Sequence, residues 1–352
     1  MAKRKIAVVL FNLGGPNNLR AVRPFLFNLF NDPDILDLPW LALPLLAGLI
    51  SFLRAPTARK IYAHLGGGSP LLANTKAQAE SLSGLLNLGE DDYRVFIAMR
   101  CWNPRSDETA RQVRNFGPDR IVLLPLYPQF SKTTTGSSCK DWTRAAAKVG
   151  LEAPTATICC YPTASGMISA QAARIKQTLC DLESDGSQEP KPRILFSAHG
   201  LPKRTVIVGD PYQWQVEQTV AAIVAELRAA SGTPAFDSVV CYQSRVGPME
   251  WIGPPITEEI VRAGEDKVPV IVIPVAFVSE HSETLVELDI ECRRFAEEQG
   301  VETYIRLPTL ATAEPFMHAL KDLVWETAES DALIRSCDGP RLCPQGLVHC
   351  PQ

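Results

Sequence analysis

Six short apolar runs, arranged as two sets of three, limit what this chain can fold into more than any other feature. Each run ends in Gly, Pro or polar residues, which is typical of buried strands. The third run of each set has an apolar-Pro-apolar core, LLPLYP in one half and VIPVAF in the other. We therefore infer that one α/β half is duplicated. The runs cover residues 6–16, 93–104, 120–131, 193–202, 236–248 and 268–280.

Helical patterns lie between these runs, for example at residues 74–88 and 213–230. Alternating strands and helices predict parallel sheets with helices on both faces, and hence two doubly wound α/β domains. We expect the domains at residues 1–160 and 161–330, with a short tail at 331–352. Ligands of such folds bind beyond the carboxyl ends of the strands.

Composition narrows the class of ligand. The formal net charge is −4 and the chain has no long basic run, which excludes a mainly phosphate-driven nucleic-acid binder. The Gly-rich segments GGP and GGGSP match neither dinucleotide nor phosphate-loop patterns. The first residues pass directly from charge into a strand pattern, so we expect a cytoplasmic protein with reduced thiols.

The segment at residues 38–53 carries no charge and contains two prolines, Pro39 and Pro44. Its 16 residues are fewer than the roughly 20 that a membrane-spanning helix needs. Two alternatives remain open at this point. The segment is either a buried helix pair or an exposed apolar lip, within residues 34–58, that rests on a membrane or admits an apolar ligand.

His199 follows one of the predicted strands directly and is trailed by Gly200 and Pro202. Its ring is therefore expected at the carboxyl edge of a sheet, where an imidazole can accept a proton or bind a metal. The alternative is a hydrogen-bonded loop histidine with no role in chemistry.

Four glutamates follow the last strand at helical spacing, with apolar residues on the opposite helix face. No Lys or Arg joins the acidic positions at i+4, so like charges repel unless a cation or a proton resides there. The pattern favours cation handling or proton relay over a solvated face. The acids are Glu280, Glu283, Glu287 and Glu291, and the apolar residues are Leu285, Leu288, Cys292 and Phe295.

Seven local motifs, in order, resemble the ferrochelatase family between about residues 5 and 325. They read FNLGGP, GGGSP, YPQFSKTTTGSS, ILFSAHGLP, GDPY, YQSRVGPMEWIGP and FVSEHSETLVELDIE. The resemblance implies a lyase that inserts Fe²⁺ into protoporphyrin IX, the last step of haem biosynthesis. It also implies two Rossmann-like halves with the porphyrin cleft between them. Two alternatives are a non-catalytic tetrapyrrole or metal carrier, and a chelatase for Co²⁺ or coproporphyrin.

Residue roles carry over from the matching motifs. His199 matches the catalytic histidine, expected to accept pyrrole protons, and Glu283 matches the acid that faces it. Glu283 and Glu287 are expected to guide the ion or the protons, with Glu280 and Glu291 on the same acidic path. The resemblance also implies porphyrin contacts through walls at Leu13, Tyr62, Tyr127 and Trp251, propionate anchors at Arg54 and Ser244, and a cleft arginine at Arg100. Cys101 and Thr57 depart from the residues of animal relatives, so propionate binding is expected to differ in detail.

The apolar segment 38–53 matches the membrane-facing lip of the family. We expect a peripheral position on the inner face of the membrane and a preference for protoporphyrin over the more carboxylated coproporphyrin.

The tail contains three cysteines, Cys337, Cys343 and Cys350, within 14 residues. Some ferrochelatases hold a [2Fe-2S] cluster with three tail cysteines and one internal cysteine, and this tail resembles theirs. The internal ligand is expected to be Cys159 or Cys160, only one of which should bind, since neighbours in a strand point to opposite faces. Ordinary surface thiols, or a zinc site that includes His349, are the alternatives.

Overall fold

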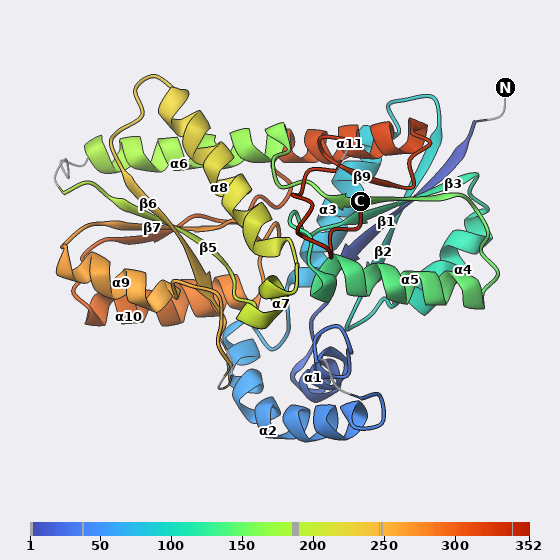
Figure 1. Cartoon of the computed structure of the whole chain (residues 1–352), viewed down its shortest axis with the longest axis horizontal. Coiled ribbons are helices and arrows are strands. Elements are labelled where there is room, and N and C mark those ends of the chain that lie inside the picture. The colour runs from blue at the N-terminus through green and yellow to red at the C-terminus, as the bar shows by residue number, and fades with distance from the viewer. Residues whose placement is uncertain (1–2, 37–38, 185–189, 246, 248, 340) are drawn as a thin grey trace. The chain divides into compact units, whose positions relative to one another are not determined.

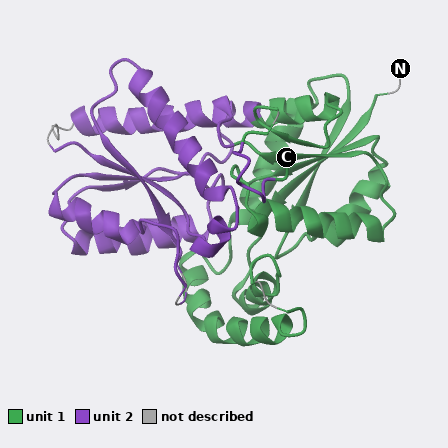
Figure 2. Cartoon of the chain, in the orientation of Figure 1, with its two compact units in different colours: residues 1–161, 320–342, 351–352 green, residues 162–319, 343–350 purple. Residues whose placement is uncertain are grey.

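The computed structural model describes the chain except residues 1–2, 37–38, 185–189, 246, 248 and 340. It divides the chain into two compact units (Figure 2). Unit 1 comprises residues 1–161, 320–342 and 351–352, and unit 2 comprises residues 162–319 and 343–350. Each unit is built around one parallel sheet.

The sheet of unit 1 has five strands in the order β2-β1-β3-β4-β9. The central strand β1 is buried from Ile6 to Asn12, as expected for an apolar run with parallel neighbours and both faces covered. Its strands are β1 (Lys5–Asn12), β2 (Asp92–Met99), β3 (Arg120–Pro125), β4 (Thr155–Cys160) and β9 (Ile334–Ser336).

Helices lie on both sides of this sheet, with α11 on one side and α4 and α5 on the other (Figure 1). Glycine at position 117 lets α4 end sharply, because its φ of 65° lies in the left-handed region. The helices of this part are η1 (Leu19–Ala21), α1 (Val22–Phe30), α2 (Leu43–His64), α3 (Leu71–Leu86), α4 (Ser106–Phe116), η2 (Lys132–Gly136), α5 (Ser137–Lys148) and α11 (Glu314–Glu329), which begins in unit 2.

The sheet of unit 2 has four strands in the order β6-β5-β7-β8, and helices again lie on both sides (Figure 1). Helices α6 and α8 cover one side, and α9 and α10 cover the other. The strands are β5 (Arg193–His199), β6 (Asp237–Gln243), β7 (Val270–Pro274) and β8 (Tyr304–Arg306). The helices are α6 (Ser165–Ser184), α7 (Lys203–Ile207), α8 (Tyr212–Ala229), α9 (Ile256–Glu265), η3 (Glu283–Cys292) and α10 (Arg293–Glu298).

The two sheets repeat one plan, which confirms the α/β class with two similar parallel sheets. The order β2-β1-β3-β4 in unit 1 corresponds to β6-β5-β7-β8 in unit 2. In both units the third strand is followed by a π-helix, η2 after β3 and η3 after β7. All six predicted strands are present. The three-residue strands β8 and β9 are too short to leave a clear apolar run in the sequence.

Residues 43–53 of the apolar segment predicted at 38–53 form the start of α2, and the buried helix pair is the wrong alternative. Leu38 lies outside the described residues. Trp40 and Leu45 are each 78% exposed, and the side chains of Leu41, Leu49, Phe52 and Leu53 are exposed as well. Pro44 stands in the first turn, where its missing N–H has no helical partner in any case. Within the described part of the chain, no helix is both long enough and apolar enough to cross a membrane.

Candidate active site

His199 is the last residue of β5, so its ring stands at the carboxyl end of the sheet in unit 2. The parallel register places Gln243, the last residue of β6, directly beside it. Gly200 follows, and its N–H donates to the backbone oxygen of Gln243 over 2.8 Å. Any side chain at Gly200 would crowd that oxygen and the indole of Trp251. The strand ends thus fix the turn that presents the histidine.

The imidazole of His199 is bound to the carboxylate of Glu283, the first residue of η3. Nδ1 of His199 lies 2.9 Å from Oε2 of Glu283. Burial lowers the pKa of His199, but the attraction and hydrogen bond of Glu283 outweigh it, and the pKa lies above its ordinary value of 6.5. Burial raises the pKa of Glu283, but His199 and His281 outweigh it, and this pKa lies well below its ordinary range. The pair therefore favours its charged form.

Glu287 lies next to this pair and is held by three donors. The backbone N–H of Ser244 donates to Oε1 over 2.7 Å, and the Ser244 hydroxyl and the Gln243 amide donate to Oε2. Ser244 has a φ of 63°, a left-handed conformation that serine seldom adopts, and this turns its N–H toward the carboxylate. Burial and the charge of Glu283 nevertheless raise the pKa of Glu287 above its ordinary value. Two neighbouring carboxyl groups whose pKa values are shifted in opposite directions are suited to proton transfer.

The acidic segment is a π-helix over all ten residues of η3, where the sequence pattern predicts an ordinary helix. Leu288 and Cys292 are buried in the core of unit 2 and Phe295 packs against them, as predicted. Glu291 is exposed at the far end of η3. π-helical turns are rare and occur frequently at functional sites, where they change the direction of side chains.

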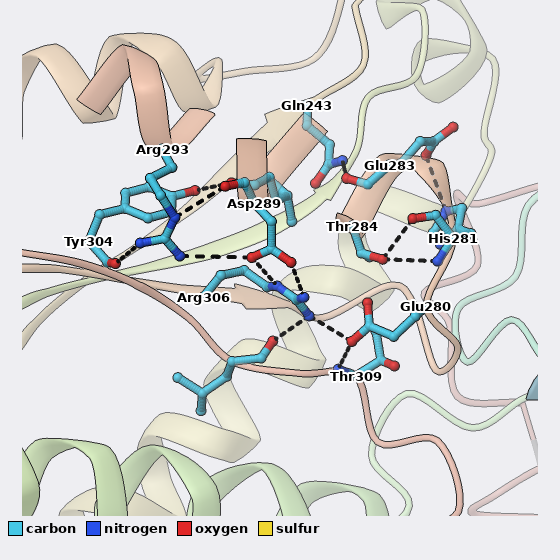
Figure 3. Close-up of polar contacts among 12 residues, drawn as sticks. Gln243, Glu280, His281, Glu283, Thr284, Asp289, Arg293, Tyr304, Arg306 and Thr309 are labelled. Carbon is cyan, nitrogen blue, oxygen red and sulfur yellow. Dashed lines mark hydrogen bonds and ion pairs between the residues drawn. The ribbon is translucent and has the colours of Figure 1, made fainter. Parts of the chain in front are cut away.

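Glu280 does not share the environment of the other acids. Its Oε1 lies 2.6 Å from Nη1 of Arg306 and accepts the N–H of Thr309 over 2.8 Å. The same guanidinium binds Asp289, so that Arg306 lies between two carboxylates (Figure 3). No Lys or Arg stands at i+4 from these acids in the sequence, but Arg306 supplies a cation to Glu280 in the fold. The cation comes from β8, which sequence spacing along one helix cannot reveal.

His281 is a site residue that the sequence analysis missed. Its Nδ1 donates to the backbone oxygen of Ser279 over 3.1 Å, which directs Nε2 toward Glu283 at 3.6 Å. The signal for it was present in the segment SEHSETL, two positions before Glu283.

Two of the predicted porphyrin contacts lie in unit 2 beside His199. Trp251 packs close to Gly200, and its neighbour Ile252 donates its N–H to the oxygen of Leu201. Ser244, the predicted propionate anchor, uses both its N–H and its hydroxyl on Glu287. Both of these hydrogen bonds go to one acid, Glu287, and not to a propionate.

The other five predicted porphyrin contacts lie in unit 1. Leu13 and Tyr62 belong to the apolar cluster that α1 and α2 form, and Tyr62 is buried there. Arg54 is exposed and stacks over Phe30, and Tyr127 packs against the sheet core. Arg100 lies 2.8 Å from the fully buried carboxylate of Asp32. A groove of about 390 Å³ lies between α1 and α2, lined by Arg23, Pro24, Phe27, Asn28, Gly48 and Ser51.

The predicted cluster cysteines occupy two places in the fold. Cys160 ends β4, and its oxygen accepts the N–H of Cys337 over 3.1 Å. Sγ of Cys159 and Sγ of Cys160 are only 3.7 Å apart, because the register of β4 against β9 shifts between Ile158 and Cys160. The premise that the two thiols point to opposite faces is therefore wrong, and the irregularity in the strand is the reason.

The two remaining tail cysteines are buried in unit 2. Sγ of Cys343 accepts a hydrogen bond from Nε2 of Gln215 over 3.1 Å. The next tail residues pack against the turn before α8, where the N–H of His349 donates to the oxygen of Gly209. Among the described residues, no group of three or more His, Cys, Asp or Glu side chains is placed to hold a metal ion.

Comparisons with known proteins agree with this geometry. The family model Ferrochelatase matches residues 5–328. A ferrochelatase of Phenylobacterium zucineum is 50% identical over 352 residues, covering 98% of this chain and 97% of the relative. One of Caulobacter vibrioides is 49% identical over 351 residues, covering 99% and 97%.

One solved structure shares the fold at low sequence identity. The sirohydrochlorin chelatase SirB from Bacillus subtilis subspecies spizizenii, in complex with cobalt, has a TM-score of 0.53 at 11% identity. The match covers 93% of this chain and 96% of that one. The family model spans nearly the whole chain and the relatives match it end to end, so this chain belongs to the ferrochelatase family.

Proposed function

We propose that this enzyme inserts Fe²⁺ into protoporphyrin IX to give protohaem, the final step of haem biosynthesis. The observation that carries the proposal is the pair of His199 and Glu283, 2.9 Å apart at the carboxyl end of β5, with Glu287 beside it. The reaction exchanges two pyrrole N–H protons for one divalent cation. A base and a partly buried pair of carboxyl groups suit this exchange.

His199 is the proposed proton acceptor. The attraction of Glu283 raises the pKa of His199, so the neutral imidazole is a stronger base than an isolated histidine. Accepting a pyrrole proton gives an imidazolium whose charge the Glu283 carboxylate then stabilises. Glu283 therefore orients the ring and stabilises the product of proton transfer.

Glu287 and Glu291 are the proposed continuation of the proton or ion path. The raised pKa of Glu287 lets its carboxyl group take up and release a proton more readily near neutral pH than an ordinary glutamate. Glu291 is exposed at the end of η3 and provides the contact with solvent. We leave Glu280 out of this path, because Arg306 and Thr309 bind its carboxylate.

The proposed porphyrin contacts are aromatic and aliphatic walls with a few cationic or hydroxyl anchors, as a flat apolar disc with two carboxylates requires. The residues are Leu13, Arg54, Tyr62, Arg100, Tyr127, Ser244 and Trp251. Trp251 has the strongest support, because it packs beside the turn that presents His199.

Metal insertion into defined porphyrins tests the function. We expect purified enzyme to insert Fe²⁺ into protoporphyrin IX faster than into coproporphyrin, and to use Co²⁺ less well than Fe²⁺. Porphyrin binding with no insertion of any metal would instead identify a carrier, and a preference for coproporphyrin would reassign the substrate.

We further propose that the exposed apolar residues just before and within the start of α2 rest on a membrane surface, so that the enzyme is a peripheral membrane protein. Trp40, Leu41, Leu45, Leu49, Phe52 and Leu53 are all more than half exposed. An exposed apolar patch is unfavourable in water and promotes aggregation, whereas an amphipathic element of this kind binds at the lipid interface.

Sedimentation with lipid vesicles tests the membrane proposal. We expect wild-type protein to sediment with phospholipid vesicles and the variant Leu45→Glu/Leu49→Glu to stay in the supernatant with unchanged secondary structure. The matched control is Leu88→Glu, an exposed leucine just after α3, which should sediment like the wild type. Equal sedimentation of all three proteins would contradict the proposal.

A [2Fe-2S] cluster is also proposed, with Cys160, Cys337, Cys343 and Cys350 as its ligands. Four cysteine thiolates are the ligands that such a cluster requires, and these four cysteines are the proposed set. Cys160 is favoured over Cys159 because its backbone bonds directly to Cys337. The amide that donates to Sγ of Cys343 is the type of second contact that cluster sulfurs accept.

When bound, such a cluster would cross-link the tail to the body of the protein. The tail already packs tightly in unit 2. Gly209 has a φ of 102°, and a side chain there would lie 2.7 Å from Cγ2 of Val348. We assign no step of metal insertion to the cluster.

A further inference from the structure

We propose that Gln243 is a positioning residue for Glu283 and Glu287, and that Ser197 fixes the orientation of the Gln243 amide. The inference rests on the proposed function and adds two residues to the site. Neither residue touches the reacting atoms in this proposal. Both act through Glu283 and Glu287.

Gln243 connects β6 to the start of the π-helix. Its Nε2 donates to the backbone oxygen of Glu283 over 3.0 Å and to Oε2 of Glu287 over 3.2 Å. One amide nitrogen therefore contacts both acidic residues. Figure 3 shows the Gln243 side chain directed at the first residue of η3.

The orientation of this amide follows from the chemistry of its neighbours. A backbone carbonyl and a carboxylate only accept hydrogen bonds, so the amide nitrogen must face them. The amide oxygen then faces the hydroxyl of Ser197, which donates to Oε1 over 2.8 Å. The side chain of Gln243 is 1% exposed and Ser197 is fully buried, so water cannot replace either contact. A flipped amide would place its oxygen against two acceptors and leave Ser197 without this bond.

The register of the sheet explains why these contacts affect the reaction. Ser197 and His199 project from the same face of β5, two residues apart. Gln243 pairs with His199 in the register of β5 and β6. The chain of contacts from Ser197 through Gln243 therefore fixes the start of η3 relative to the same strand that presents the catalytic base. Moving this start would change the direction of Glu283 toward His199 and release one of the three donors of Glu287.

The test combines two substitutions with a matched control. Gln243→Met keeps the size of the side chain and removes the donor, and Ser197→Ala removes only the hydroxyl. The control is Gln171→Met, which replaces a buried glutamine on α6 of the same unit, away from the acids. Steady-state constants for Fe²⁺ and for protoporphyrin are measured for each variant and for the double variant Ser197→Ala/Gln243→Met. Unfolding midpoints are measured alongside.

We expect Gln243→Met to lower kcat/KM for Fe²⁺ by about 10–100-fold, the usual effect of removing a group that orients a ligand. Protoporphyrin affinity, measured by fluorescence quenching, should stay unchanged, and Gln171→Met should keep wild-type constants. Ser197→Ala should have a smaller effect, which disappears in the Gln243→Met background because both act through one amide.

A second measurement, of metal binding alone, tests the positioning role of Gln243 without relying on enzyme turnover. Titration of porphyrin-free protein with Co²⁺, followed by its visible absorption, should show at least about tenfold weaker binding by Gln243→Met than by wild type. Equal Co²⁺ affinity, or effects of the two substitutions that add in full, would overturn the positioning role. A wild type that binds Co²⁺ but inserts no metal would contradict the proposed function alone, because the comparison of Co²⁺ affinities would still stand.

Discussion

Nδ1 of His199 lies 2.9 Å from a carboxylate oxygen of Glu283, although 84 residues separate them in the chain. Two neighbouring strands bring them together. His199 ends β5, and Glu283 opens the π-helix that follows β7, the strand beside β5 in the sheet. Each residue stabilises the charged form of the other, so a change at one position must alter the protonation of the other.

Replacing the proposed base, His199, should greatly slow metal insertion without weakening porphyrin binding. We expect His199→Ala to lower kcat by about 10²–10⁴-fold, the usual contribution of a positioned general base. Protoporphyrin affinity, measured by fluorescence quenching, should stay within a few-fold of wild type. The control is His318→Ala, an exposed histidine on α11. Wild-type turnover by His199→Ala would remove this residue from the mechanism.

The pH dependence of activity should report the protonation state of His199 in its pair with Glu283. The pKa of His199 is raised above 6.5, so the imidazole stays protonated to higher pH than usual, and a base is needed in its neutral form. The acid limb of the kcat/KM profile should therefore lie above pH 6.5 and rise with pH. In Glu283→Gln the attraction of Glu283 is lost while burial and the weaker attraction of Glu287 remain, so the pKa of His199 should fall relative to the wild type, as NMR titration of the ring would show. An unchanged pKa in this variant would contradict the coupling.

Much of this site could be predicted from sequence because strand ends are local signals. An apolar run followed by SAHGLP places His199 at a sheet edge, and the spacing of the glutamates places Glu283 and Glu287 on one helix face. The repeat of the apolar-Pro-apolar core predicted a duplicated α/β half, and the matching strand order of the two sheets agrees with that duplication.

The remaining features depend on contacts between distant segments. Arg306 lies 26 residues from Glu280, and no spacing rule connects a strand residue to an acid on the preceding loop. The side chains of Cys159 and Cys160 approach each other because β4 is irregular against β9, a strand contributed by the C-terminal region. Tyr62 was predicted as a porphyrin wall from its motif, and its burial in the α1–α2 cluster arises from the packing of two helices.

The loss of activity on replacing a glutamate should depend on the position of that glutamate along the π-helix. Glu283→Gln removes the charge that pairs with His199, and we expect a loss of about 10²-fold or more in kcat/KM for Fe²⁺. Glu291→Gln should change it by about twofold or less, because solvent and salt screen an exposed charge. Equal and mild losses in the two variants, measured in the same insertion assay, would identify a solvated acidic face instead of a path.

The buried ion pair of unit 1 should be important for stability. The carboxylate of Asp32 is fully buried, lies 2.8 Å from Arg100 and accepts the hydroxyl of Ser137. Asp32→Asn leaves the arginine without its counter-charge, which should lower the free energy of unfolding by about 3–5 kcal/mol. Asp34→Asn removes an ion pair with the exposed Lys140 and should lower it by about 1 kcal/mol or less. Urea unfolding measures both, and similar midpoints for the two variants would contradict the structural role of Asp32.

The tail cysteines should bind iron and sulfide. Protein purified without oxygen should be coloured and contain about two irons and two labile sulfides per chain, as a [2Fe-2S] cluster requires. Cys343→Ser should lose the colour and the iron, since it removes one of four thiolate ligands, and should lower the unfolding midpoint by freeing the tail from unit 2. Cys241→Ser, at a thiol buried in the core of unit 2, is the control and should keep the colour.

Gln215→Leu should retain the cluster but shift its reduction potential to a lower value, because a hydrogen bond to a ligand sulfur favours the reduced form. Stoichiometric zinc with no labile sulfide would exclude the cluster, and a metal-free, fully active wild type would show that these are ordinary thiols.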